Sequence, residues 1–177
     1  MNLENLGIEG CYLIENFVAQ DSRGYFVKTF HEQSFLDKKL ETEFRESYYS
    51  ISKKGVIRGM HFQIPPHEHN KLVYVTQGEI LDVILDIRKT SATYGKYISV
   101  KLNAHDYCIY IPKGCAHGFL TTSEEATVIY NVSTVYNPSA DGGILWNSFG
   151  FEWDNNNPVI SSRDKSFQSF KEFYSPF

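Results

Sequence analysis

The chain has 177 residues, a formal net charge of −4 and an aromatic content of 15%. This length allows a sizeable hydrophobic core, and we expect a single domain over residues 1–177. The acidic balance disfavours nucleic acid as a partner. We also expect no membrane association, because no apolar run approaches the ~20 residues that cross a bilayer, and no signal-peptide pattern is visible.

The cysteines indicate a reducing compartment. The chain has three cysteines, an odd number, and they lack the short spacing of metal ligands: Cys11, Cys108 and Cys115. Proteins of oxidising compartments usually use cysteines in pairs, so we expect reduced thiols and a cytoplasmic location.

Short apolar runs separated by turn residues recur along the chain. Strands are predicted at 11–14, 25–27, 71–76, 80–87, 97–102, 107–111, 118–121 and 127–135. Turns are predicted at 21–24 and 77–79, and short helices at 32–40 and 166–173. This many short strands predicts an all-β sandwich or barrel with a small helical content.

The edges of an open β-sandwich must be covered. The N-terminal strands could do this by pairing with a second subunit, so we expect a two-fold homodimer formed through them.

The segment 56–63 carries the first candidate catalytic residue. His61 lies in or beside an apolar strand pattern, and Lys71 follows ten residues later. A base and a cation in one pocket suit removal of a proton next to a carbonyl, because the cation stabilises the enolate oxygen. Taken alone, the pair could equally be a core histidine and a surface lysine.

A second segment, 111–119, contains Pro112, Gly114 and His117 in the pattern Pro-x-Gly-x-x-His. It resembles the second motif of the cupin superfamily, whose fold is a double-stranded jelly roll with this histidine facing inward. Gly78 resembles the turn that closes the first cupin motif.

Many cupins bind a metal, and His67, His69 and His117 could supply three nitrogen ligands. The expected glutamate is missing, because Val73 and Tyr74 stand at its position. We therefore favour a solvated loop for His67 and His69 and expect no metal.

Several segments taken together resemble the dTDP-4-dehydrorhamnose 3,5-epimerase family over about residues 8–166. They are 21–24, 58–63, 71–73, 86–88, 111–119, 136–138, 141–144 and 160–164, with Tyr130. The resemblance implies a cupin jelly roll that epimerises a nucleoside-diphosphate-4-keto-6-deoxyhexose without a metal or redox cofactor. It also implies a role in deoxysugar biosynthesis of the dTDP-rhamnose type, as used for lipopolysaccharide or capsule.

The resemblance assigns four catalytic roles. His61 is the base that removes the C3 and C5 protons, and Asp164 holds its imidazole. Tyr130 returns a proton from the opposite face, and Lys71 stabilises the enolate oxygen at C4. Without the resemblance, Tyr130 could be a core tyrosine and Asp164 a helix cap.

The resemblance also implies a set of ligand-binding residues. These are Arg23, Phe26, Lys28, Glu46, Tyr48, Arg58, Gln63, His117, Tyr136, Asp141 and Arg163. Arg23 and Arg58 would neutralise the diphosphate, and Tyr136 would stack on the base.

Five of these positions depart from the family pattern. Asp141 stands where glutamate is usual, and Arg163 replaces a common lysine with the charge preserved. The other three usually hold the base and ribose. Lys28 stands where glutamate is common, and Glu46 and Tyr48 stand where glutamine and asparagine are usual. Because glutamine both donates and accepts hydrogen bonds and an ionised glutamate only accepts, the carrier stays open among dTDP, CDP and GDP. A C3-only or C5-only epimerase, a ketoisomerase, a non-catalytic sugar-binding module and a metal-dependent cupin are the alternatives.

Overall fold

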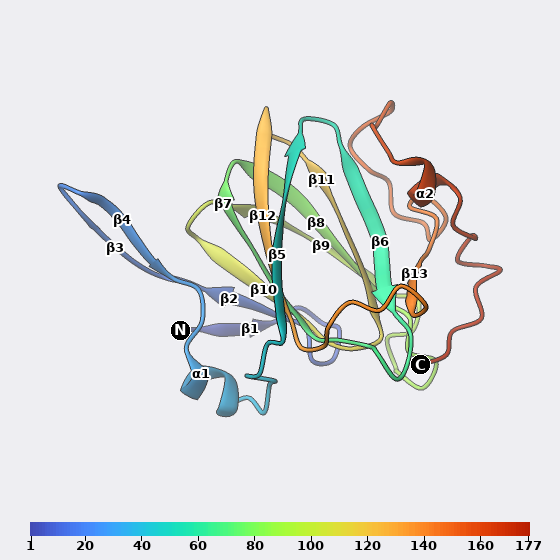
Figure 1. Cartoon of the computed structure of the whole chain (residues 1–177), viewed down its shortest axis with the longest axis horizontal. Helices are drawn as coiled ribbons and strands as arrows, with labels where there is room; N and C mark the ends of the chain where they lie inside the picture. Colours follow the sequence, from blue (N-terminus) through green and yellow to red (C-terminus); the bar gives the residue numbers. More distant parts are fainter.

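The regular structure is almost entirely β, in a computed structural model that describes residues 1–177 (Figure 1). The six-stranded sheet runs in the order β1 (Leu3–Asn5), β2 (Tyr12–Glu15), β10 (Tyr107–Ile111), β7 (Lys71–Gln77), β12 (Glu125–Val132) and β5 (Glu46–Lys53). The five-stranded sheet runs in the order β13 (Asp141–Gly143), β6 (Ile57–Gln63), β11 (Cys115–Thr121), β8 (Glu79–Asp86) and β9 (Tyr97–Asn103). All ladders in both sheets are antiparallel, which agrees with the predicted all-β sandwich.

The hydrophobic core has two main parts because side chains alternate across each sheet. The first lies between the sheets and includes Val73 and Val128 from one sheet and Ile84 and Phe119 from the other. The second covers the outer face of the five-stranded sheet, where the segment after β13 packs its aromatic side chains. In Figure 1 this orange and red segment lies beside β6 and β13.

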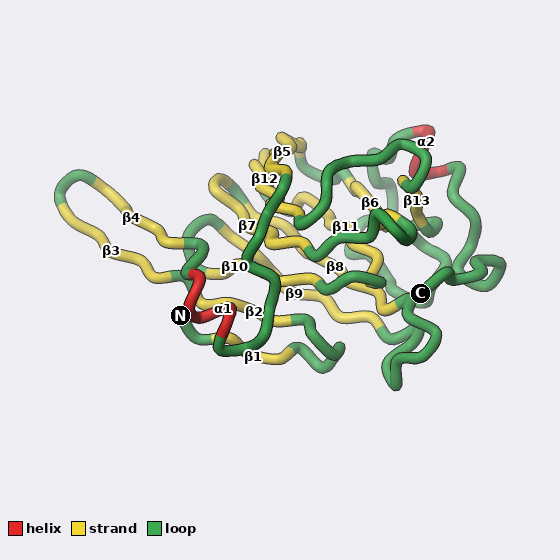
Figure 2. Tube along the Cα trace, turned by 60° about the horizontal axis from the view of Figure 1, so that its bottom comes forward, coloured by secondary structure: helices red, strands yellow, loops and turns green.

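A two-stranded hairpin, β3 (Phe17–Asp21) and β4 (Gly24–Lys28), extends away from the sandwich (Figures 1 and 2). Every residue of β3 is exposed. Phe17 is 54% exposed and Phe26 is 61% exposed, and Val18 and Tyr25 are exposed as well. By the register of the hairpin, Phe17 and Phe26 lie on one face, and Val18 and Tyr25 lie on the other. Exposed apolar side chains on a projecting arm are typical of an interaction site.

The predicted strands agree with the structure to within a few residues, but the short strands β1, β3 and β13 and the longer β5 were not predicted, and β6 was noted only as an apolar strand pattern around His61. β5 was not predicted as a strand, although it forms the edge of the six-stranded sheet next to β12. Its sequence mixes serine, tyrosine and charged residues, so the apolar alternation that marks the other strands is weak.

The helix predictions were less accurate. The first helix, α1, covers only Glu32–Leu36, because the chain turns through a left-handed conformation at Lys39 (φ 57°). The predicted helix at 166–173 is wrong, since the second helix, α2, is Ser162–Lys165. After α2 the chain is not helical, and the rings of Phe173 and Phe177 each pack against the ring of Phe62. No helix is long and apolar enough to cross a membrane.

Candidate active site

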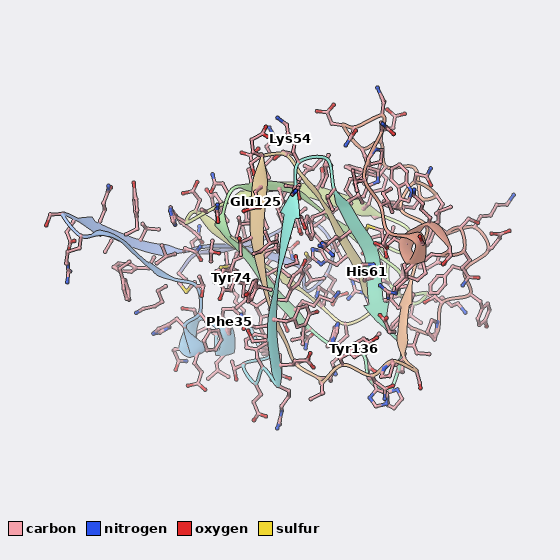
Figure 3. All side chains as sticks on the ribbon, turned by 45° about the horizontal axis from the view of Figure 1, so that its top comes forward. Phe35, Lys54, His61, Tyr74, Glu125 and Tyr136 are labelled. Atoms are coloured by element: carbon pink, nitrogen blue, oxygen red, sulfur yellow. The ribbon has the colours of Figure 1, made fainter.

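Two adjacent cavities that share lining residues lie between the sheets. The outer cavity has a volume of about 440 Å³ and the inner one about 270 Å³. His61, Lys71 and Tyr48 line both of them. Figure 3 shows His61 on β6 and Tyr136 after β12, at the end of the sandwich opposite to Lys54.

Strand alternation explains why these polar side chains meet. Residues two apart on one strand face the same way. A core residue that faces inward therefore predicts that the residues two positions before and after it also face inward. Lys71 shares its face of β7 with the core residue Val73, and Tyr130 shares its face of β12 with Val128. The polar site is therefore a continuation of the core between the sheets.

His61 is held by an aspartate from α2. Its Nε2 lies 2.9 Å from Asp164 Oδ1, while Asp164 Oδ2 accepts from the backbone N–H of Gly59 at 3.1 Å. Ser161 caps α2 by accepting from the Asp164 backbone N–H. Arg163 Nη1 also approaches His61 Nε2, but at 3.3 Å. Because the carboxylate is an acceptor and is closer, we assign the imidazole hydrogen to Nε2, which leaves Nδ1 unprotonated.

The electrostatics suit a neutral base. Burial lowers the pKa of His61, and its contact with Asp164 offsets only part of this effect. Burial raises the pKa of Asp164, but the hydrogen bonds from His61 and Gly59 outweigh it and hold that pKa below its usual value. The pair therefore contains a carboxylate and a neutral imidazole at pH 7.

Lys71 is buried at the junction of the two cavities. Its Nζ donates to the backbone carbonyl of His61 at 3.1 Å. Burial lowers the pKa of Lys71 to about 8, although Asp82 and Asp141 act in the opposite direction. The side chain thus stays mostly protonated at pH 7 and can stabilise a developing negative charge.

Tyr130 lies across the inner cavity on β12. Its hydroxyl is 3.4 Å from Ser50 Oγ, and its ring packs edge-on against His117. Burial raises the pKa of Tyr130, so the phenol remains a proton donor throughout the physiological range.

A second histidine–aspartate pair lies beside the first. His117 Nε2 donates to Asp82 Oδ1 at 2.7 Å, and both side chains are almost completely buried. Asp82 Oδ2 has no hydrogen-bond partner. Sequence reasoning missed Asp82, although an aspartate between the core residues Ile80 and Ile84, on the same face of β8, could have indicated it.

The rim of the outer cavity is a hydrogen-bonded network. Arg163 donates to Asp141 at 2.5 Å, and Glu46 accepts from the backbone N–H of Tyr136 at 2.6 Å. Gln63 accepts from the backbone N–H of Asn137 at 2.6 Å. These contacts join β5, β6 and the segment after β12 around the opening.

His67 and His69 lie in a loop, as predicted, but both are only partly exposed. His67 pairs through Nε2 with the Asn137 amide at 2.9 Å, which ties the loop to the segment after β12. His69 lines the outer cavity, where burial lowers its pKa to about 3. No group of three or more His, Cys, Asp or Glu side chains is arranged to hold a metal ion.

The structure brings most of the predicted site residues together, but not those of the hairpin. Arg58 reaches the inner cavity, and its Nε donates to Ser52 Oγ at 2.8 Å. By contrast, Arg23, Phe26 and Lys28 lie on the projecting hairpin and line neither cavity of their own chain.

Comparison with known proteins matches the whole site-bearing region. The sequence model of the dTDP-4-dehydrorhamnose 3,5-epimerase family matches residues 5–172. The chain is 38% identical to dTDP-4-dehydrorhamnose 3,5-epimerase of Shigella flexneri, with 96% of each chain covered. It is 39% identical to the enzyme of that name from Methanothermobacter thermautotrophicus, covering 93% of this chain and 92% of the relative.

A solved structure is similar over the same region. The crystal structure of dTDP-4-dehydrorhamnose 3,5-epimerase from Elizabethkingia anophelis superimposes with a TM-score of 0.89 at 34% identity, covering 97% of each chain.

Proposed function

Because this chain belongs to the dTDP-4-dehydrorhamnose 3,5-epimerase family, and so is a sugar-nucleotide 3,5-epimerase of cupin jelly-roll fold, we propose that His61 and Tyr130 carry the two opposed proton transfers of its reaction. The names of its relatives support a nucleoside-diphosphate-4-keto-6-deoxyhexose as substrate, with dTDP as the carrier.

The observation that carries this proposal is the placement of base and acid on facing sheets. His61 belongs to β6 of the five-stranded sheet, and Tyr130 belongs to β12 of the six-stranded sheet. Both line the inner cavity together with Lys71. A sugar ring between the sheets would meet a base on one face and an acid on the other, which is what inversion of a carbon centre requires.

The steps follow from this geometry. Nδ1 of His61 removes the proton from the carbon next to the C4 ketone, and the C–H electron pair becomes the enolate whose charge rests on the C4 oxygen. The Lys71 ammonium stabilises that oxygen. Tyr130 then protonates the carbon from the other face, the carbonyl re-forms, and proton exchange with solvent restores both side chains.

The outer cavity suits the nucleotide. Tyr136 offers an exposed ring for stacking, and Arg163 contributes a guanidinium beside Asp141. Arg58 is a second cation of the inner cavity besides Lys71, and we place it next to where the diphosphate would join the sugar. The Glu46 carboxylate is already engaged by the Tyr136 backbone, which gives it a structural task in place of base recognition.

The hairpin supports a homodimer. Arg23, Phe26 and Lys28 are exposed on an arm that extends from the sandwich (Figure 1). If they contact substrate, they can do so only in a second copy of the chain. We therefore propose that the hairpin of each subunit extends to the site of the other subunit, with its exposed apolar residues in the interface.

The location follows from the thiols and the substrate. Cys11, Cys108 and Cys115 are all buried and unpaired, which supports a reducing cytoplasm. We propose that the epimerase acts in deoxysugar biosynthesis, and that the pathway supplies sugar nucleotides for surface polysaccharides such as lipopolysaccharide or capsule.

Deuterium incorporation tests the proposal directly. The protein is incubated in heavy water with dTDP-4-keto-6-deoxyglucose and, in parallel, with its CDP counterpart. We expect label at both C3 and C5, with the dTDP compound as the better substrate. Label at only one carbon would show a mono-epimerase, and absence of label with both nucleotides would refute the proposed chemistry.

Two variants separate the roles of base and acid. His61→Asn should abolish exchange at both carbons while ligand binding persists. Tyr130→Phe should keep exchange by His61 but lose inversion, because protonation can then return only from the original face. Equal loss of exchange in both variants would contradict the assignment of Tyr130 as the opposed acid.

A further inference from the structure

Tyr48 forms an aromatic pair with the proposed acid. Tyr48 on β5 and Tyr130 on β12 are directly opposite in the ladder. Their rings stack with centroids 4.9 Å apart and an interplanar angle of 20°. Cross-strand aromatic pairs of this kind restrict the orientation of both rings.

Besides its packing in the core, Tyr130 has only weaker polar and aromatic contacts. Its hydroxyl has a single long contact with Ser50, and His117 touches it only edge-on with centroids 6.1 Å apart. The stack with Tyr48 is therefore the closest aromatic contact that holds the plane of this ring.

Tyr48 also lies where the two cavities join. It lines both of them and remains 42% exposed, whereas Tyr130 is buried. One face of its ring thus contacts the acid while other parts of the side chain border the ligand space. An asparagine side chain at this position could not form such a stack.

We propose that Tyr48 is a positioning residue for Tyr130, which sets how often the enolate is protonated from the Tyr130 face rather than from the His61 face. The inference rests on the proposed function. An enolate reprotonated by the imidazolium returns to substrate, whereas one protonated by the phenol becomes the epimer. The partition between these outcomes depends on how well the Tyr130 hydroxyl is aimed at the carbon.

The partition can be measured in heavy water with dTDP-4-keto-6-deoxyglucose. Recovered substrate that contains deuterium reports return on the His61 face, and labelled epimer reports inversion. Tyr48→Asn should lower the ratio of inversion to return by about 2- to 10-fold, the range expected for loss of one aromatic stack. The rate of label entry depends on His61 and should fall by a smaller factor than this ratio.

Matched variants separate the ring from its hydroxyl. Tyr48→Phe keeps the stack and should keep the wild-type ratio. Tyr48→Leu keeps apolar bulk without an aromatic face and should behave like Tyr48→Asn. Tyr49→Asn is the control, because Tyr49 is the next residue on β5, faces the other way and is 67% exposed. It should leave the ratio unchanged.

The outcomes distinguish this inference from the proposed function. If the wild type shows neither return nor inversion, the proposed chemistry fails first. If the wild type shows both, and Tyr48→Asn and Tyr48→Leu keep its ratio, the positioning role is refuted. A rise in KM with an unchanged ratio would show that Tyr48 contacts the ligand without aiming Tyr130, and would refute it as well.

Discussion

His61 and His117 are register partners on β6 and β11, and each is paired through Nε2 with its own aspartate. The side chain of His61 is 30% exposed, whereas that of His117 is 2% exposed. Both imidazoles line the inner cavity, but that of His61 is far more accessible to a ligand. The second pair braces the wall of the cavity from within.

Replacing Asp164 tests the tautomer of His61. Asp164→Asn keeps the shape of the side chain but removes the carboxylate that fixes the hydrogen on Nε2. We expect kcat to fall by about 10²–10⁴-fold, with KM little changed. Because Asp164 raises the pKa of His61, its loss should also move the acid limb of the pH profile to lower pH. An acid limb that moves to higher pH would contradict the assignment.

The pH dependence of kcat/KM should be bell-shaped. Burial lowers the pKa of His61 below its usual value of 6.5, so the base is lost only below that pH. Burial lowers the pKa of Lys71 to about 8, so the cation is lost as the pH rises through this value. Tyr130 stays protonated throughout, since burial raises its pKa.

The alkaline limb has its own control. Lys71→Arg retains a positive charge at high pH, so any activity it keeps should show no decline near pH 8. A wild-type rate that is constant between pH 8 and 10 would contradict the role of the Lys71 charge.

The buried pair His117–Asp82 should show strong coupling in stability. His117→Leu leaves the Asp82 carboxylate buried without a partner, and we expect a loss of about 3–5 kcal/mol in the free energy of unfolding. The double variant Asp82→Leu/His117→Leu should recover much of that loss. Urea unfolding of the two single variants and the double variant gives a double-mutant cycle. If the two single losses add up to the loss of the double variant, the pair is not coupled.

The arm of the partner subunit can be tested by mixing two inactive variants. Arg23→Ala damages the proposed phosphate contact on the hairpin, and His61→Asn removes the base. In a mixed dimer with exchanged arms, one site carries both defects and the other carries neither. Activity should therefore reappear on mixing, after exchange of subunits, and a mixture as inactive as its components would place Arg23 outside the partner's site.

Gly59 should tolerate no side chain. Its φ is 147°, and an added Cβ would lie 2.5 Å from the Cα of Gly118 on β11. Gly59→Ala should cost at least about 2 kcal/mol in stability and displace His61, two residues further along β6. Thermal unfolding and the deuterium exchange rate measure the two effects, and Gly24→Ala, with open space around its Cβ, is the comparison for backbone strain alone.

Much of the fold could be predicted because its signals are local. The strand at 107–111 was predicted with its observed bounds, and Gly78 marks the turn between β7 and β8 with a φ of 77°. The edge strand β5 was missed because its inward side chains, Tyr48 and Ser50, face a polar cavity rather than the apolar core.

The site was predictable where a residue matched a motif and not where it depended on a neighbouring strand. His61, Lys71 and Tyr130 were named from the sequence, and the structure places all three around the inner cavity. The pattern of β8 could have shown that Asp82 faces inward, but only the register of β8 with β11 brings it to His117. The stack of Tyr48 on Tyr130 likewise arises from a pairing across 82 positions of chain that no local pattern reveals.

The two sheets hold the proposed base and acid on separate layers, so the thickness of the sandwich becomes a chemical parameter. Phe119 on β11 and Val128 on β12 lie in the core between those layers, in the same two strands that carry His117 and Tyr130. A bulkier or smaller residue there would alter the gap that a sugar ring must fill, without touching either proton-transfer group. The same core side chains therefore determine both the packing of the sandwich and the distance between the proposed base and acid, so a substitution that changes the packing also changes that distance.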